Sequence, residues 1–185
     1  KAWPRIGDVA VVIGGRTGKD GLHGATFSSA AIDEEVTSGV VQIGNAIEEK
    51  KVLDAIIKAR DQKLFNAITD CGGGGFSSAI GEMAKDLGAE VELSSVPLKY
   101  KGMRPWEIWL SESQERMVLA VPEDKLERLQ EICEVEGTEL AVIGKFAKTK
   151  KLVIKRNGQS VANIDMDFLH NGLPKQKRTA IAKNE

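Results

Sequence analysis

The chain has 185 residues, of which 42% are hydrophobic and 29% are charged, and its formal net charge is -1. This length and composition are typical of a single globular domain with a sizeable core. A nearly neutral chain gives no reason to expect nucleic-acid binding, and no apolar run reaches the roughly 20 residues that span a membrane.

The two cysteines, Cys71 and Cys133, are too few for a disulfide framework, and their sequence neighbours are not metal ligands. We therefore expect a reducing, cytoplasmic environment. The start of the chain has no signal-peptide pattern. Because residue 1 is Lys rather than Met, we expect the chain to be a fragment of a longer polypeptide.

Apolar runs bounded by turn residues predict about seven strands, several of them separated by helices. The predicted strands cover residues 8–13, 66–69, 89–93, 117–121, 140–146, 151–156 and 161–165. The pair Asn157-Gly158 is a strong two-residue turn signal and predicts a hairpin between the last two strands.

Three segments have the apolar period of a helix. The first segment has about 14 residues and is preceded by Asn45. Glu48 follows three residues after Asn45, which is the spacing of a capping box. The apolar stripe predicted for this helix is Val52, Leu53, Ile56 and Ile57. The second stripe is Phe76, Ala79, Ile80, Met83, Ala84 and Leu87, with Gly88 as the residue that ends the helix. The third helix follows Pro122, with Leu126, Leu129, Ile132 and Cys133 facing inward.

These elements predict an α/β (α+β) fold, a layered mixed β-sheet of about six to seven strands with about three helices. Residues 1–174 form the predicted domain. The polar, lysine-rich segment 175–185 is interpreted as a linker or tail that leads toward a missing second half.

The first candidate site is the glycine-rich loop at residues 14–27, directly after the first strand. Its free backbone N–H groups, together with Arg16 and Lys19, suit a phosphate or another anion. The alternative is a mobile surface loop with solvated charges, which composition alone slightly favours. His23 in this loop is interpreted first as a plain loop residue.

The second candidate is the run Asp70-Cys71-Gly72-Gly73-Gly74-Gly75, between a strand and a helix. Its glycines offer N–H groups at a helix N-terminus, which attracts anions. A carboxylate beside a phosphate is repulsive unless a cation lies between them, so Asp70 is interpreted as a Mg²⁺ ligand. The alternative is that Asp70 caps a turn and the glycines only permit a tight bend.

The third candidate is the polar run 111–116 between two apolar segments. Glu112, Ser113 and Gln114 offer donors and acceptors to a polar ligand. Gln42, a polar residue inside an apolar run, needs a hydrogen-bond partner, which is either backbone or ligand. Trp106 and Trp109 are interpreted as core or domain-interface residues.

Five stretches in order resemble the phosphoribosylformylglycinamidine synthase family, of the aminoimidazole ribonucleotide synthetase superfamily. They are residues 14–27, Val41-Gln42-Ile43-Gly44, residues 70–75, residues 105–108 with 111–117, and residues 165–174. The resemblance covers nearly the whole chain up to Pro174. It implies a fold like the carboxy-terminal domain of aminoimidazole ribonucleotide synthetase.

The resemblance also implies an ATP-dependent carbon-nitrogen ligase of purine biosynthesis. Such enzymes convert formylglycinamide ribonucleotide, ATP and glutamine-derived ammonia to the amidine, ADP and phosphate. Carried over to this chain, Gln42, Glu112, Ser113 and Gln114 would bind the ribonucleotide and Asp70 would bind Mg²⁺. Arg16 and Lys19 are hypothesised to bind its phosphate.

No catalytic residue is assigned to this chain, because the family's catalytic histidine and most of its ATP contacts lie on other domains. The implied partners are those domains and a glutaminase subunit or domain, and self-association as a homodimer is a further expectation. The fragment alone is expected to be inactive. The alternative is a non-catalytic ligand-binding or interaction domain that kept the fold; a weaker one is a superfamily relative acting on another small substrate.

Overall fold

The computed structural model describes residues 3–22 and 44–174 of the chain. The predictions for Gln42, His23 and the tail at 175–185 lie outside the described residues. Five stretches carry the family resemblance. The first two are described only in part, and the other three are described in full.

Seven strands form one mixed sheet with the order β2-β4-β1-β5-β3-β6-β7. Neighbouring strands are antiparallel except β3 and β6, which are parallel. The strands are β1 (Val9–Gly14), β2 (Ala67–Asp70), β3 (Ala89–Glu92), β4 (Arg116–Val121), β5 (Leu140–Phe146), β6 (Lys151–Arg156) and β7 (Gln159–Asp165). The mixed sheet confirms the predicted fold class.

Five α-helices and two 3-10 turns accompany the sheet in the described residues. The helices are α1 (Ala46–Asp61), α2 (Gly75–Met83), α3 (Pro105–Leu110), α4 (Leu126–Glu136) and α5 (Met166–Asn171), and the turns are η2 (Leu93–Ser95) and η3 (Glu123–Lys125). Three helices correspond to the predicted ones. The two additional helices, α3 and α5, have six residues each, too few for a periodic apolar stripe to be recognised. None of the described helices has both the length and the apolarity needed to cross a membrane.

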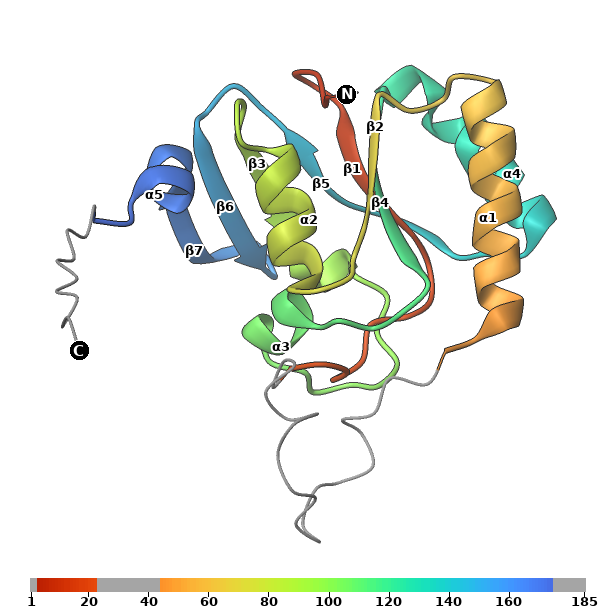
Figure 1. Cartoon of the computed structure of the whole chain (residues 1–185), viewed down its shortest axis with the longest axis horizontal. Helices are drawn as coiled ribbons and strands as arrows, with labels where there is room; N and C mark the ends of the chain where they lie inside the picture. The colour runs from red at the N-terminus through yellow and green to blue at the C-terminus, as the bar shows by residue number, and fades with distance from the viewer. Residues whose placement is uncertain (1–2, 23–43, 175–185) are drawn as a thin grey trace, which may run out of the picture.

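Helices cover both faces of the sheet, and Figure 1 shows α1 and α4 side by side, with α2 on the opposite face. Successive residues of β1 therefore enter two different cores. Val9, Val11 and Ile13 pack with α1 and α4, whereas Ala10 and Val12 pack with α2. A strand buried on both faces is apolar throughout, which is why residues 9–13 form an uninterrupted apolar run.

Helix α1 faces the core through residues other than those predicted. Its buried residues are Val52, Ala55 and Ala59, whereas Leu53 and Ile57 of the predicted stripe are 50% and 37% exposed. The two alanines belong to the same core cluster as Leu129, Ile132 and Cys133 of α4. The stripe prediction was wrong for Leu53 and Ile57 because it weighted large side chains over small ones.

The cap of α1 also differs from the prediction. The Asn45 side chain accepts hydrogen bonds from the N–H groups of Ile47 and Glu48, each at 3.2 Å, as an N-cap should. The capping box does not form, because the Asn45 N–H donates to Glu115 at 2.9 Å. The Glu48 carboxylate instead accepts from the Thr138 hydroxyl at 2.9 Å.

The hairpin of β6 and β7 is confirmed, with Asn157 and Gly158 at φ 50° and 75°. The carboxylate of Glu92 accepts hydrogen bonds from the N–H groups of Ser94, Asn157 and Gly158, each at 2.9 Å. These donors, Ser94 foremost, lower the pKa of Glu92 to about 2. Ionised Glu92 therefore stabilises the folded chain at pH values above its ordinary pKa.

We expect Glu92→Gln to lower the thermal midpoint by a few degrees at pH 7. Because the folded-state pKa is lowered, this stabilisation is present above about pH 4.3 and is lost as the pH falls toward 2. The difference between wild type and variant should therefore shrink across this window in thermal unfolding monitored by circular dichroism. Glu127→Gln, an exposed glutamate on α4, is the control. A difference independent of pH would contradict the assignment.

Candidate functional site

Three loops meet at one end of the sheet, and they carry the three candidate motifs. Strand β4 lies between β1 and β2 and is antiparallel to both. The carboxyl ends of β1 and β2 therefore lie beside the start of β4. This topology brings together residues 15–22, which follow β1, residues 71–74, which follow β2, and residues 111–115, which precede β4 (Figure 1).

Ser113 joins the first loop to the polar run. Its side chain is buried, and its hydroxyl accepts a hydrogen bond from the Gly18 N–H at 2.8 Å and contacts the carboxylate of Asp20. Asp20 also forms an ion pair with Lys99 at 2.9 Å. Burial opposes the charge of Asp20, but the hydrogen bonds from Ser113 and Lys99 hold the pKa of this carboxyl below its ordinary value.

The charges of the first loop are paired within the described residues. The guanidinium of Arg16 bonds to Glu139 at 2.8 Å, and the ammonium of Lys19 lies 3.2 Å from Glu107. The two cations thus have carboxylate partners on different elements. Both cations remain about half exposed, with 59% of the Arg16 side chain and 48% of the Lys19 side chain accessible. The described part of the loop, residues 14–22, therefore combines solvated charges with contacts to Glu139, Glu107 and Ser113.

Glu112 joins the polar run to the glycine turn. Its carboxylate accepts the Gly74 N–H at 2.9 Å, at the N-terminus of α2. A Cβ on Gly21 would lie only 2.4 Å from the same carboxylate, so Gly21 is required for this approach. Glu112 therefore occupies one of the amides that the glycine run was predicted to offer to an anion.

Three further amides of the turn also have internal acceptors. The N–H groups of Gly72, Gly75 and Ser77 donate to Asp70, Gly72 and Gly74 respectively. The amides of Gly72, Gly74, Gly75 and Ser77 thus have acceptors within the chain, and an anion site at this turn stays a prediction. Gly74 and Gly75 have φ values of 79° and 55°, which is the left-handed region that the bend requires.

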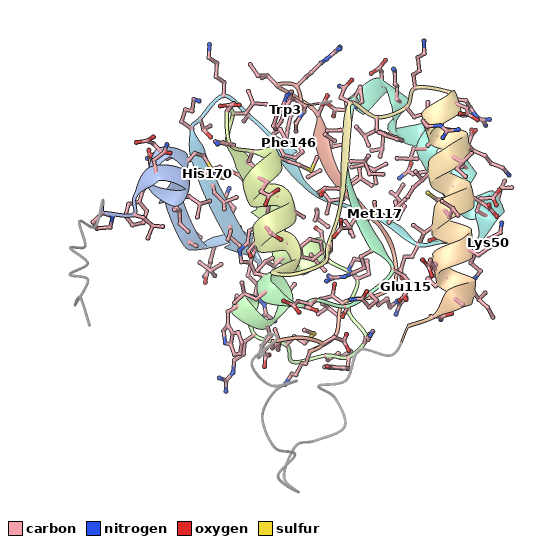
Figure 2. All side chains as sticks on the ribbon, in the orientation of Figure 1. Trp3, Lys50, Glu115, Met117, Phe146 and His170 are labelled. Atoms are coloured by element: carbon pink, nitrogen blue, oxygen red, sulfur yellow. The ribbon has the colours of Figure 1, made fainter. Side chains whose placement is uncertain are left out.

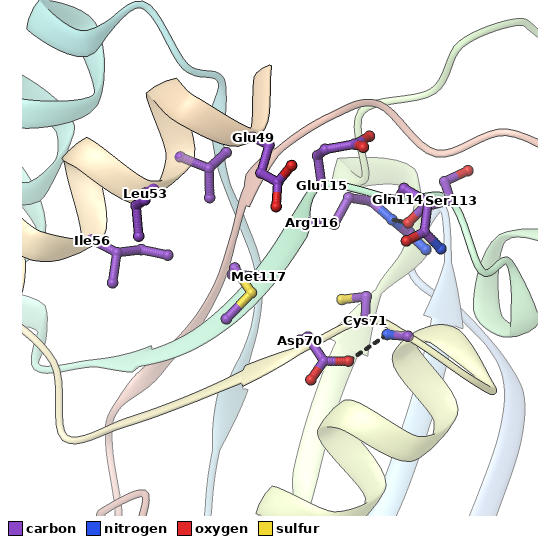
Figure 3. A pocket seen from close by; sticks show the side chains of 12 residues that line it. Glu49, Leu53, Ile56, Asp70, Cys71, Ser113, Gln114, Glu115, Arg116 and Met117 are labelled. Carbon is purple, nitrogen blue, oxygen red and sulfur yellow. Dashed lines mark hydrogen bonds between the residues drawn. The ribbon is translucent and has the colours of Figure 1, made fainter. Parts of the chain in front are cut away.

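The position of Asp70 is compatible with both of its predicted roles, as the cap of a turn and as a Mg²⁺ ligand. One oxygen of its exposed carboxylate accepts the Gly72 N–H at 2.8 Å, which is the predicted turn contact. Figure 3 shows the other oxygen directed away from that bond. In residues 3–22 and 44–174 there is no group of three or more His, Cys, Asp or Glu residues that could hold a metal ion. A single carboxylate suits Mg²⁺ held mainly by ligand phosphates and water.

A pocket of about 450 Å³ brings several predicted residues together (Figure 3). Asp70, Ser113 and Gln114 line its polar wall, together with Cys71, Gly72, Glu115 and Arg116. Helix α1 contributes Glu49, Val52, Leu53 and Ile56 to the lining, and Met117 of β4 lines the pocket as well. The partly exposed apolar side chains of α1 thus border the pocket.

A second pocket of about 450 Å³ lies beside the first and contains Arg16. Gln114 and Glu115 line both pockets. Figure 2 shows Glu115 at the end of the sheet where α1 begins. Of the predicted residues, Glu112 and Lys19 line neither pocket. Glu112 instead supports the glycine turn that carries Asp70.

Sequence reasoning missed Arg116 and Glu115. Arg116 is charged but only 2% exposed, and Glu115 has a φ of 55°, unusual for a side chain other than Gly. The carbonyl of Glu115 accepts the Gly15 N–H at 3.0 Å, which ties the two loops. One feature of the sequence could have identified both residues, namely the abrupt change at Arg116 from a polar run to an apolar strand.

Cys71 lies in the pocket wall but is not a reactive thiol. Burial raises the pKa of Cys71 to about 11, so the group is a neutral thiol at pH 7. Cys133 is buried and unpaired as well.

Comparisons with known proteins match residues 5–157 to the family described as AIR synthase related protein, C-terminal domain. Among curated proteins, the chain is 39% identical over 175 residues to phosphoribosylformylglycinamidine synthase subunit PurL of Methanothermobacter thermautotrophicus, which covers 90% of this chain and 24% of that protein. It is 36% identical over 169 residues to the Thermoplasma volcanium subunit of the same name, covering 89% of this chain and 22% of that protein. The chain therefore spans less than a quarter of these relatives.

Solved structures show the same fold. Thermotoga maritima PurL complexed with FGAR matches all of this chain and 31% of its own chain, with a TM-score of 0.84 and 31% identity. The same protein complexed with ATP gives a TM-score of 0.81 and 28% identity over all of this chain and 29% of its own. Escherichia coli HypE, a hydrogenase maturation protein, matches 89% of this chain and 52% of its own, with a TM-score of 0.62 and 18% identity, which is a likeness of fold alone.

We expect Gly75→Ala to destabilise the chain strongly. A Cβ there would lie 2.0 Å from the Ser111 carbonyl oxygen, and the left-handed backbone adds about 1–2 kcal/mol. Gly73→Ala in the same turn is the matched control, because its Cβ would meet nothing within 4 Å. Urea denaturation should give a free energy of unfolding lower by at least about 2 kcal/mol for Gly75→Ala and little change for Gly73→Ala. Equal effects would contradict the close approach of the two loops.

Proposed function

The chain belongs to the AIR synthase related protein family, as a C-terminal domain, and we propose that it is the substrate- and Mg²⁺-binding domain of a formylglycinamidine ribonucleotide synthetase. In this proposal the complete enzyme transfers the terminal phosphate of ATP to the amide oxygen of formylglycinamide ribonucleotide. Ammonia from glutamine then displaces this phosphate, which carries the amide oxygen away and leaves the amidine and ADP. The observation that carries the proposal is the common pocket of Asp70, Ser113 and Gln114.

The proposed roles of the residues follow from their contacts. Gln114 borders both pockets, where its amide would donate to and accept from the ribonucleotide. Ser113 would act mainly through its backbone, because its hydroxyl is already bonded to Gly18 and Asp20. Glu112 would hold the turn that presents Asp70. Gln42, outside the described residues, keeps its proposed substrate contact.

Asp70 would hold Mg²⁺ through its second carboxylate oxygen. The ion would neutralise phosphate charge beside this carboxylate, the main requirement of phosphoryl transfer. Arg16 would bind the ribonucleotide phosphate by exchanging its exposed pair with Glu139, a pair of low stability because both side chains are solvated. The corresponding proposal for Lys19 needs release of Glu107, whose pKa is held below its ordinary value by the Arg104 N–H and by Lys19.

The proposed partners are the remaining domains of the synthetase, which would carry most ATP contacts, and a glutaminase subunit or domain. Exposed apolar side chains on α1, such as Ile47 at 71% exposure, support contact with other domains or with a second copy in a homodimer. We propose a cytoplasmic location, as expected for an enzyme with unpaired thiols.

The proposal predicts that the chain binds formylglycinamide ribonucleotide more tightly in the presence of Mg²⁺, as measured by titration calorimetry. Asp70→Asn should abolish the Mg²⁺ enhancement, and Gln114→Leu should weaken binding about tenfold, as the loss of one or two hydrogen bonds does. The matched controls are Asp61→Asn at the end of α1 and Gln130→Leu on α4, both exposed and absent from the pocket lining.

Two outcomes would contradict the proposal. One is binding that neither substitution changes, which would place the ligand elsewhere. The other is a folded chain that binds no ribonucleotide, either alone or mixed with the remaining domains of a synthetase. That second result would favour a non-catalytic interaction domain.

A further inference from the structure

Arg116 is a buried cation at the point where the three loops meet. It is the first residue of β4 and is 2% exposed. Its guanidinium donates three hydrogen bonds: from Nε to the Ser113 carbonyl at 2.8 Å, from Nη1 to the Thr17 hydroxyl at 2.8 Å and from Nη2 to the Ser111 carbonyl at 2.6 Å. The side chain thus contacts both the loop after β1 and the run before β4.

The same residue also contacts the glycine turn and the helix after it. The carbonyl of Arg116 accepts the Cys71 N–H at 3.1 Å. The guanidinium carbon lies 4.8 Å from the centre of the Phe76 ring of α2. Arg116 therefore links all three candidate segments, and Ser113 extends the link to Gly18.

The three acceptors of the guanidinium are neutral oxygens. Removing an ion from water for such acceptors costs free energy that the contacts do not fully return, and burial lowers the pKa of Arg116. Its contribution is therefore geometric: the planar guanidinium directs its donors along fixed lines, which a lysine ammonium cannot reproduce.

We propose that Arg116 is a positioning residue, which holds the loop after β1, the turn after β2 and the run before β4 in the arrangement that lets Asp70 and Gln114 face one ligand. The identity of that ligand rests on the function proposed above, whereas the arrangement of the loops does not. The test therefore measures the loops and the ligand separately.

The first measurement is amide hydrogen exchange of the 185-residue chain by NMR, comparing wild type with Arg116→Lys. We expect exchange of the Gly18 and Gly74 amides to rise by about tenfold or more, since each amide is bonded to a side chain of the linked run. Amides of β6 and β7 should change less than about twofold. Exchange that rises equally everywhere, or not at all in the loops, would overturn the proposal. Arg128→Lys, an exposed arginine on α4, is the control.

A second pair of variants applies where Arg116→Lys does not fold. Thr17→Val removes the acceptor of Nη1 and keeps the shape of the side chain, whereas Thr17→Ser keeps the hydroxyl. We expect faster exchange of the Gly18 amide in Thr17→Val only. Equal exchange in the two variants would overturn the proposal.

The second measurement is binding of formylglycinamide ribonucleotide to the same variants. If wild type binds, Arg116→Lys should weaken binding about tenfold and Arg128→Lys should not change it; unchanged binding in Arg116→Lys would overturn the positioning role. If wild type binds neither alone nor mixed with the remaining domains of a synthetase, the proposed function fails for this chain, and the exchange measurement still decides whether Arg116 organises the loops.

Discussion

Strand β4 pairs with β1 on one side and with β2 on the other, and the candidate site depends on this shared partner. Because both pairs are antiparallel, two strand ends and one strand start come to the same edge of the sheet. Three segments that are far apart along the chain thereby become neighbours. The α1 helix packs beside this edge and provides the apolar wall of the pocket.

Polar contacts and close backbone approaches hold the three loops, while apolar packing holds the sheet beneath them. Ser113 and Arg116 bond to the loop after β1, and Glu112 bonds to the turn after β2. Gly75 allows the Ser111 carbonyl to approach the start of α2. Loops ordered in this way before a ligand arrives lose less entropy on binding than free loops would. The arrangement suits a site that selects a polar ligand through a small number of hydrogen-bonding groups held in fixed positions.

Elements with a local signal could be predicted from the sequence, and those that depend on a neighbouring element could not. The hairpin at Asn157-Gly158 was predicted because its turn type requires these residues. The inward face of α1 was predicted only in part, because its buried alanines, Ala55 and Ala59, have no strong apolar signal of their own. The capping box failed because Glu115, 70 residues away, takes the N–H of Asn45.

The sequence by itself determined the strands, the principal helices, the three polar or glycine-rich segments and the family resemblance, because each depends on residue types within a short window. Only the tertiary structure decided which groups meet. It paired Gly18 with Ser113 across 95 positions and Gly74 with Glu112 across 38, and it buried Arg116 between them. The physical reason is that such pairs follow from strand order and antiparallel direction, which hydrophobic periodicity along the chain does not specify.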